Sequence, residues 1–599
     1  MDTTQKRLRA LRKAMKESGI DACVIPATDP HLGEYVPDHW KIIRWLTGFT
    51  GSAANIVITH TFAGLWTDSR YFIQAEQQLS GSGFELFKLR IPHTPEYIDW
   101  LAVNLRKNSV VGIDGRVYAT GLHKKMEKAL ASKSISVDIS VDLISALWID
   151  RPSMPSSQAF EHTPEFTGLS REEKISRVRS RMAEIGVDHH LLTSPDDIMW
   201  LLNIRGSDVQ FCPLIICYAL ITPGQLLLFV NEEQIPQPLR RDFDRAGVVM
   251  LPYEETATIM RKLSRRTSLL LNPSTTSAAL YSSVGSDVEV TEDVTVPTRL
   301  KAIKNITEIM NIRQTMIKDG VALTKFFFWF ESAVGRERVT EISAAEKLLQ
   351  FRMDQKGCCG ASFETISAWN AHAALPHYAP SEENETDIAG TGIYLLDSGG
   401  QYHGGTTDVT RCTVFGEPTA RQKRDFTLAL KGTIALAMVK FPLGTRGYQV
   451  EILARKALWD NGLNYGHGTG HGVGYFLNVH EGPQTIGTGA SGDLKTILEP
   501  GMLTADEPAI YRPGEYGFRT ENLLLCVDDE LTEYGQFLRF ETVTLCYIEK
   551  KLIDVSVLTG EERKWIDNYH RQVFASLADK LTEEEKEWLR EKTTPLPVS

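Results

Sequence analysis

The chain has 599 residues, of which 42% are hydrophobic and 24% charged, and its formal net charge is -11. One hydrophobic core does not grow to this size, so the length predicts three or four domains. The acidic balance argues against a general nucleic-acid-binding protein, which needs a basic surface, and no apolar run approaches the ~18 residues of a membrane span. We therefore expect neither nucleic acid nor a membrane as a partner.

Cysteine usage and the N-terminal stretch both point to the cytoplasm. Eight cysteines are few for this length, and none of them forms a Cys-x-x-Cys pair. This usage is typical of a reduced, cytosolic compartment. The basic stretch 1–21 lacks the apolar core of a targeting peptide, so we expect it to form the first helix of the fold.

A helix, a strand and a Trp-Leu segment follow one another in the same order at residue 5 and again at residue 170. The helices end at "GID" and "GVD", and the Trp-Leu segments are "WLTG" and "WLLN". Each copy continues into strand-like runs, at 53–68 and at 214–230. Strands that alternate with helices predict two α/β domains, at 1–155 and 165–300, joined by a linker rich in Pro and Ser at 151–164.

A third region has a different texture. Apolar residues recur at helical spacing over 300–332, which predicts long helices at its start. From 360 to about 550 the sequence is strand-like and punctuated by glycine, and the tail predicts two amphipathic helices. We therefore expect an α+β domain at 301–550 and a helical extension at 551–599, so that the chain as a whole is of the α/β class.

Two glycine-rich turns in this region each carry a pair of acidic residues. A hairpin over 391–416 with its turn centred between Tyr402 and His403 places Asp397 directly opposite Asp408. A hairpin over 504–525 centred at Gly514 does the same for Glu507 and Glu521. Opposed carboxylates repel each other unless a cation lies between them.

The glycine-rich stretch "GHGTGHGVGYFLNVHEGP" at 466–483 adds His467, His471 and His480. Taken alone, a histidine in such a loop is more often a turn or surface residue than a ligand, and solvated edge carboxylates explain either acidic pair alone. Both pairs have apolar neighbours, however, and four carboxylates with one imidazole suit two divalent ions of the Mn, Co or Zn type. Paired ions of this kind activate a shared water, so the expected chemistry is hydrolysis.

The order and spacing of these residues resemble the metal set of the pita-bread metallopeptidases. The surrounding sequences "LDSGGQYHGGTTDVTR", "EPGMLTADEPAIY" and "GFRTENLLL" are similar to aminopeptidase P, in particular to its eukaryotic cytosolic type. The resemblance covers essentially the whole chain. It implies two creatinase-like N-terminal domains followed by a pita-bread catalytic domain, and hydrolysis of the N-terminal X-Pro bond of peptides through a metal-bridging hydroxide.

The resemblance also implies roles for individual residues. It implies two divalent metal ions per chain, with Mn²⁺ expected before Zn²⁺ or Co²⁺, and the ligands Asp397, Asp408, His471, Glu507 and Glu521. It implies catalytic roles for His377, His480 and Glu507. It implies substrate contacts from Arg70, His377, His467, His480 and Arg519.

Several alternatives to these roles stay open. His377 also fits a capped loop histidine, His467 a packing residue and Arg70 a surface ion pair. For the whole chain, the alternatives are a prolidase-like X-Pro dipeptidase and a catalytically inactive pita-bread binding protein. The expected partners are peptides with proline at position 2 and a second copy of the chain in a homodimer.

Overall fold

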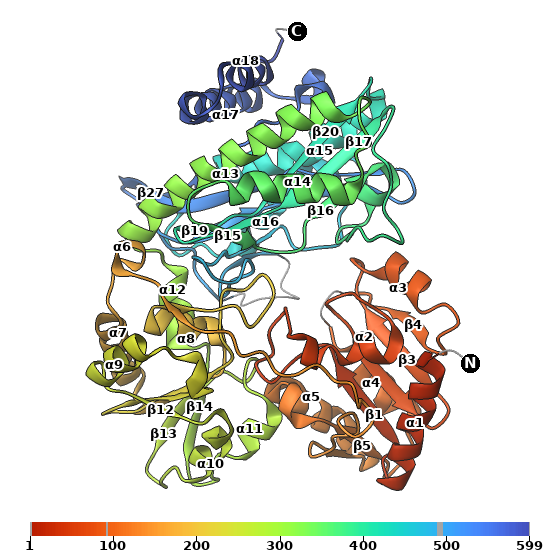
Figure 1. The fold of residues 1–599 in the computed structure, drawn as a ribbon, viewed down its shortest axis with the longest axis vertical. Coiled ribbons are helices and arrows are strands. Elements are labelled where there is room, and N and C mark those ends of the chain that lie inside the picture. The colour runs from red at the N-terminus through yellow and green to blue at the C-terminus, as the bar shows by residue number, and fades with distance from the viewer. Residues whose placement is uncertain (1–2, 92–93, 488–494, 598–599) are drawn as a thin grey trace. The chain divides into compact units, whose positions relative to one another are not determined.

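A computed structural model describes residues 3–91, 94–487 and 495–597 (Figure 1). The chain divides into two compact units: Met1–Thr163 with Leu169–Leu300, and Pro164–Gly168 with Lys301–Ser599. Grouping of the short segment 164–168 with the second unit was not expected from the sequence. The domain boundaries drawn from the sequence stay predictions. None of the helices within the described ranges is long and apolar enough to cross a membrane.

The first unit contains two six-stranded sheets with the same topology, which confirms the duplicated module. Their strand orders are β4-β3-β2-β1-β5-β6 and β12-β11-β10-β8-β13-β14. In each sheet the third and fourth strands of this order pair antiparallel with each other. The two outermost strands at either edge pair parallel. The strands are β1 (Ala22–Pro26), β2 (Asn55–Thr59), β3 (Ala63–Thr67), β4 (Glu85–Lys88), β5 (Val110–Ile113), β6 (Ser136–Asp138), β8 (His189–Leu192), β10 (Tyr218–Ile221), β11 (Leu226–Phe229), β12 (Val248–Leu251), β13 (Ser268–Leu271) and β14 (Glu289–Glu292).

The opening helix of each module is defined by local sequence. α1 (Thr3–Glu17) buries an apolar stripe that includes Leu8, Leu11 and Met15. α7 (Arg171–Ile185) begins at a capping box formed by Ser170 and Glu173, which satisfies backbone donors that the first turn leaves unpaired. The "GID" and "GVD" stops follow the two helices, and both glycines have a positive φ (69° and 83°), a conformation that glycine adopts readily.

The second unit combines small antiparallel sheets with long helices. It opens with the long helices that the sequence predicts, and its main core joins the aromatic face of α13 to the sheet β16-β17-β20 and to the C-terminal helices. The elements that position the site are α13 (Ile306–Ala333), α14 (Glu341–Met353), α15 (Ala420–Met438), α16 (Gly447–Trp459), β16 (Ile366–Trp369), β17 (Gly392–Ser398), β18 (Gly400–Tyr402), β19 (Gly405–Thr406), β20 (Val409–Phe415), β22 (Gly470–His471), β23 (Thr485–Ile486), β24 (Leu503–Asp506), β25 (Ala509–Arg512), β26 (Tyr516–Arg519), β27 (Asn522–Thr532) and β28 (Gly535–Thr542).

The predicted register of the first acidic hairpin is wrong. In the structure Asp397 pairs with Thr410, and not with Asp408. The pairing closes at Tyr402 opposite Gly405, so the turn is centred one residue later than expected. The reason is packing of the turn on α13: a Cβ at Gly404 would lie 3.0 Å from Thr315 Oγ1, so the turn presents a glycine there. Asp408 is still on the same face as Asp397, as a diagonal neighbour.

The predicted register of the second acidic hairpin is confirmed. Both β24–β27 and β25–β26 have the register that a turn centred at Gly514 requires. Glu507 and Glu521 lie between these two ladders, where their backbone N–H groups turn to other segments. Glu507 N donates to Thr469 O at 2.9 Å, and Glu521 N donates to Thr410 O at 3.1 Å.

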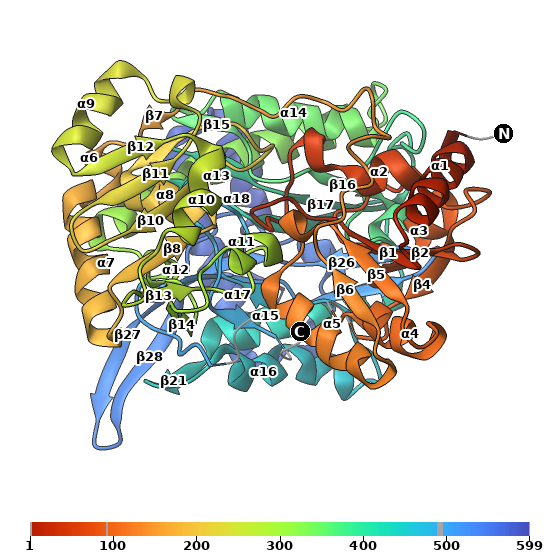
Figure 2. The same cartoon turned by 90° about the horizontal axis from the view of Figure 1, so that it is seen from below.

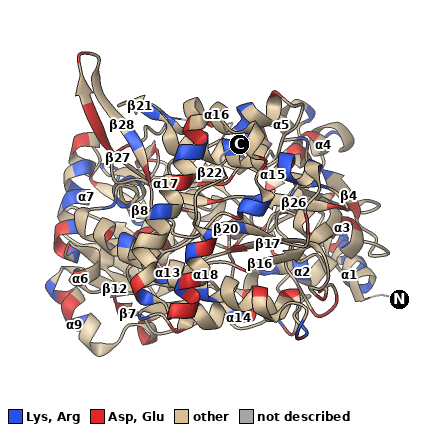
Figure 3. Cartoon of the chain, turned by 90° about the horizontal axis from the view of Figure 1, so that it is seen from above, with Lys and Arg blue, Asp and Glu red and all other residues tan. Residues whose placement is uncertain are grey.

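The C-terminal region supplies two further features of the second unit. β27 and β28 form a long hairpin that extends past its sheet (Figure 2). The tail forms the two expected helices, α17 (Gly560–Leu577) and α18 (Glu583–Lys592). Acidic and basic residues are interspersed along them (Figure 3). α17 buries an apolar stripe in the main core, and α18 contributes Leu589 to it.

Candidate active site

The glycine-rich stretch places His471 on the short strand β22, which pairs with β23. The glycines on either side of it are required by close backbone approach. A Cβ at Gly470 would lie 1.8 Å from the carbonyl oxygen of Ala505, and one at Gly472 would lie 2.1 Å from the carbonyl oxygen of Glu481. Because any larger residue would collide with backbone, the pattern Gly-His-Gly fixes the imidazole against β24.

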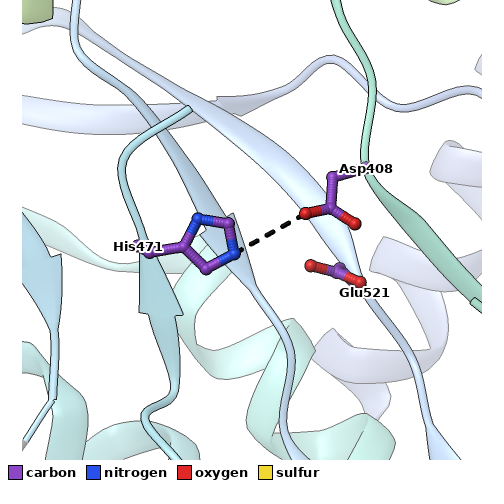
Figure 4. A group of neighbouring side chains, drawn as sticks. All are labelled: Asp408, His471 and Glu521. Carbon is purple, nitrogen blue, oxygen red and sulfur yellow. Dashed lines mark ion pairs between the residues drawn. The ribbon is translucent and has the colours of Figure 1, made fainter. Parts of the chain in front are cut away.

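Three of the five expected ligands form one compact group. Ligand atoms of Asp408, His471 and Glu521 all lie within 4.8 Å of one another. His471 Nε2 is 3.6 Å from Asp408 Oδ2, and its ring points toward both carboxylates (Figure 4). The Thr410 hydroxyl donates to Glu521 Oε2 at 2.8 Å and so fixes the orientation of that carboxylate.

The other two expected ligands lie at the edge of this group. Glu507 Oε1 is 3.9 Å from His471 Nε2, and its Oε2 is 3.8 Å from His467 Nδ1. Asp397 Oδ2 accepts a hydrogen bond from Arg519. Asp397 Oδ1 is buried and has no hydrogen-bond partner among the described residues. An oriented carboxylate with one oxygen left over is suited to binding a cation.

The electrostatics of the group favour a bound cation. Burial raises the pKa of Asp408 well above its ordinary value, and the carboxylates of Glu521, Asp397 and Glu507 raise it further. Burial and the carboxylates of Asp397 and Glu507 also raise the pKa of Glu521, against the opposing effect of Arg519. Protonation or a bound cation relieves this repulsion. Carboxylate oxygens with one imidazole are the donors that Mn²⁺, Zn²⁺ and Co²⁺ accept, so the residues present fit such an ion.

The remaining histidines adjoin this group in different ways. The ring centroid of His480 is 4.2 Å from that of His471, with the planes at 81°. His467 Nε2 is 2.8 Å from the Tyr511 hydroxyl. His377 directly follows Pro376, whose carbonyl accepts a hydrogen bond from Arg519 Nη2 at 3.4 Å.

Tyr511 belongs to the site, although it is not among the residues that the sequence predicts there. Its partly buried hydroxyl contacts both His467 Nε2 and Arg519 Nη1, and Arg519 in turn contacts Asp397. Burial raises the pKa of Tyr511, so the phenol stays protonated. A signal was present: Tyr511 lies on β25, only four residues after the expected ligand Glu507.

Arg70 lies in the first unit, between β3 and α3 (Phe72–Gln78). Its Nε and Nη2 each donate to the Asp68 carboxylate at 2.8 Å. Because both side chains are largely buried, this is a fixed bidentate pair and not a loose surface contact. Substrate contact by Arg70 stays a prediction.

Family models match four consecutive parts of the chain. Creatinase/prolidase N-terminal domains match residues 7–145 and 150–308. Metallopeptidase family M24 matches residues 310–528, and the C-terminal region of peptidase M24 matches residues 536–596. The expected fold, two creatinase-like domains followed by a pita-bread domain, is confirmed.

Two of three similar proteins match over nearly the full length of the chain, and the third matches over part of it. The chain is 37% identical to a probable Xaa-Pro aminopeptidase P of Coprinopsis cinerea, over 99% of this chain and 98% of that protein. An X-prolyl aminopeptidase of Caenorhabditis elegans, described as a cytosolic enzyme with a di-nuclear active site, superimposes with a TM-score of 0.95 at 34% identity and 100% coverage of both chains. A Xaa-Pro dipeptidase of Bacillus anthracis matches with a TM-score of 0.50 at 25% identity, over 63% of this chain and 99% of that one.

Proposed function

The chain belongs to the Xaa-Pro aminopeptidase P family of metallopeptidases, and on this basis we propose that it removes the first residue of peptides that have proline in second position. The observation that carries the proposal is the group of Asp408, His471 and Glu521. It lies in a chain that matches an X-prolyl aminopeptidase over its entire length.

The two alternatives have less support. The dipeptidase of B. anthracis corresponds to only 63% of this chain, whereas the aminopeptidase of C. elegans corresponds to all of it. An inactive binding protein would have no need to keep four carboxylates and a histidine together at the cost of their mutual repulsion. The proposal therefore retains peptide hydrolysis and places the cleaved bond before proline.

The proposed cofactor is a pair of divalent ions, with Mn²⁺ preferred over Zn²⁺ and Co²⁺. The residues that would hold them are Asp397, Asp408, His471, Glu507 and Glu521. Such ions would activate a water for attack on the scissile carbonyl and supply positive charge near it. The oxygen-rich ligand set favours a hard ion such as Mn²⁺.

The side chains around this group have separate proposed roles. Glu507, with about 20% of its side chain exposed, accepts a proton from the attacking water and passes it to the leaving nitrogen. His377 and His480 orient the substrate and donate hydrogen bonds to the developing oxyanion. Arg519 holds the Asp397 carboxylate in place.

Selection for proline is assigned to a pocket lined by His467 and His480. A proline ring fills such a pocket with apolar contact, and it brings no N–H that needs a partner. Alanine in its place loses about two methylenes of contact at ~0.8 kcal/mol each. It also buries an unpaired N–H at a cost of ~1–3 kcal/mol. Together these effects correspond to roughly 10²–10³-fold in kcat/KM.

The experiment compares Arg-Pro-Pro, Arg-Ala-Pro and the dipeptide Arg-Pro with metal present. We expect Arg-Pro-Pro to be cleaved on the order of 10²–10³-fold faster than Arg-Ala-Pro, and Arg-Pro to be a poor substrate. Comparable rates on the first two peptides would contradict proline selection. Preference for Arg-Pro would favour the dipeptidase instead.

The cellular setting and assembly are also proposals. The aminopeptidase of C. elegans is described as cytosolic, and the free cysteines of this chain support the same compartment. A homodimer is supported by three exposed apolar side chains on one face of α16, Tyr448, Ile452 and Trp459. Sedimentation analysis at several protein concentrations tests it, and a monomer throughout would contradict it.

A further inference from the structure

Glu341, the first residue of α14, has a fully buried side chain. A carboxylate in the interior is costly unless hydrogen bonds replace its lost hydration. Part of that stabilisation comes from the N-terminus of α14, where unpaired backbone N–H groups favour negative charge. Direct donors from elsewhere in the chain must supply the rest.

Among the described residues, the four donors to this carboxylate all come from one segment, residues 369–386. Oε1 lies 2.7 Å from Trp369 N and 2.9 Å from His372 Nδ1. Oε2 lies 2.7 Å from the Tyr378 hydroxyl and 2.9 Å from Thr386 N. Because the four donors include both ends of the segment and two points between them, the carboxylate acts as a common anchor for it.

This segment carries His377 at its centre. On one side of His377, Tyr378 bonds to Glu341. On the other side, the carbonyl of Pro376 accepts a hydrogen bond from Arg519, which contacts Asp397. His377 therefore lies between two anchors, one at the metal-ligand group and one at the start of α14.

We propose that Glu341 is a positioning residue for His377, an inference that rests on the proposed function. Glu341 sets the path of segment 369–386 and through it the location of the His377 imidazole. The carboxylate is required because only an acceptor with two oxygens satisfies donors on both sides. A glutamine would turn its NH₂ group toward at least one backbone N–H.

The variant Glu341→Gln tests this role through the turnover of Arg-Pro-Pro. A small displacement of a substrate-orienting group costs on the order of 10–100-fold in rate, and we expect a loss of that size in kcat with metal content unchanged. Glu308→Gln is the matched control. Glu308 is a buried glutamate in the first turn of α13 that bonds to Asn305 N, and we expect normal turnover from this variant.

A double-mutant cycle separates positioning from general destabilisation. If Glu341 acts through His377, the double variant Glu341→Gln/His377→Ala should turn over as slowly as His377→Ala alone, within about twofold. Losses that multiply across the two substitutions would overturn the proposal, and so would normal kcat in Glu341→Gln.

Hydrogen exchange provides a readout that does not depend on activity. In Glu341→Gln we expect faster exchange across 369–386 and unchanged exchange across 466–481. Should the wild-type chain cleave none of the peptides, the proposed function would fail and this measurement would still decide the inference. Unchanged exchange across 369–386 would overturn it.

Discussion

Two groups of buried carboxylates in the second unit differ in what balances their charge. In the first group each carboxylate has its own cation: Asp319 lies 2.8 Å from Arg352, and Glu481 lies 2.6 Å from Lys304. Removing either partner from such a pair leaves an uncompensated charge in a nonpolar interior. These pairs are complete in the protein itself.

The second group is the site, where carboxylates outnumber the cations placed among them. Burial and mutual repulsion raise the pKa values of Asp408 and Glu521, whereas Arg519 is the guanidinium that opposes this. The site is therefore built with a deficit of positive charge. Bound divalent ions would remove the deficit.

The largest expected effect is that of Asp408→Ala on catalysis. Removing a ligand from the compact group should abolish metal binding at that position and lower kcat/KM by more than about 10³-fold. Metal analysis and Arg-Pro-Pro hydrolysis are measured on the same sample, with circular dichroism as the control for folding. A variant with full metal content and normal turnover would contradict the role of Asp408.

The two neighbouring histidines should separate metal binding from catalysis. His471→Ala is expected to lose metal, because its imidazole is the nitrogen donor in the group. His480→Ala should keep its metal and lose ~10²–10⁴-fold in kcat. An equal loss of metal in both variants would contradict this division of roles.

Asparagine substitutions should have opposite effects on stability in the two groups. Asp319→Asn leaves Arg352 buried without a counter-charge and should lower the free energy of unfolding by about 3–5 kcal/mol. Asp408→Asn in metal-free protein removes one of the mutually repelling charges and should raise it by about 1–2 kcal/mol. Thermal unfolding after exhaustive chelation measures both, and destabilisation by Asp408→Asn would contradict the charge deficit.

Acidification should stabilise the metal-free protein, by an effect of about 1–2 kcal/mol. Folded-state pKa values of Asp408 and Glu521 lie above those of the unfolded chain. At a pH between the unfolded and the folded pKa of each group, the folded state therefore binds more protons than the unfolded chain. Stability falls as pH rises through the folded pKa values. Metal-loaded protein should respond oppositely between about pH 7 and pH 5, since protons compete with metal for the ligands. The same pH response in both forms would contradict the account.

The sequence predicted more of the site than of the contacts that hold it. The repeated helix stops "GID" and "GVD" predicted two similar modules, because the same order of helix, strand and Trp-Leu segment repeats around them. The pairing around Gly514 was predictable because the turn sequence there allows one centre. The turn around Tyr402 allows several turn centres. Packing of Gly404 on α13, a helix far away in the sequence, selects one of these centres. Glu341 left no such signal, since its role depends on donors from a distant segment.

We propose that the second unit holds a metal centre built from Asp397, Asp408, His471, Glu507 and Glu521. The most direct test is the metal content of the purified chain, measured by mass spectrometry before chelation, after chelation and after add-back of Mn²⁺, with Arg-Pro-Pro hydrolysis followed at each stage. The account predicts two divalent ions per chain, loss of hydrolysis on their removal, and recovery of both together. Hydrolysis that persists in fully metal-free protein would contradict it.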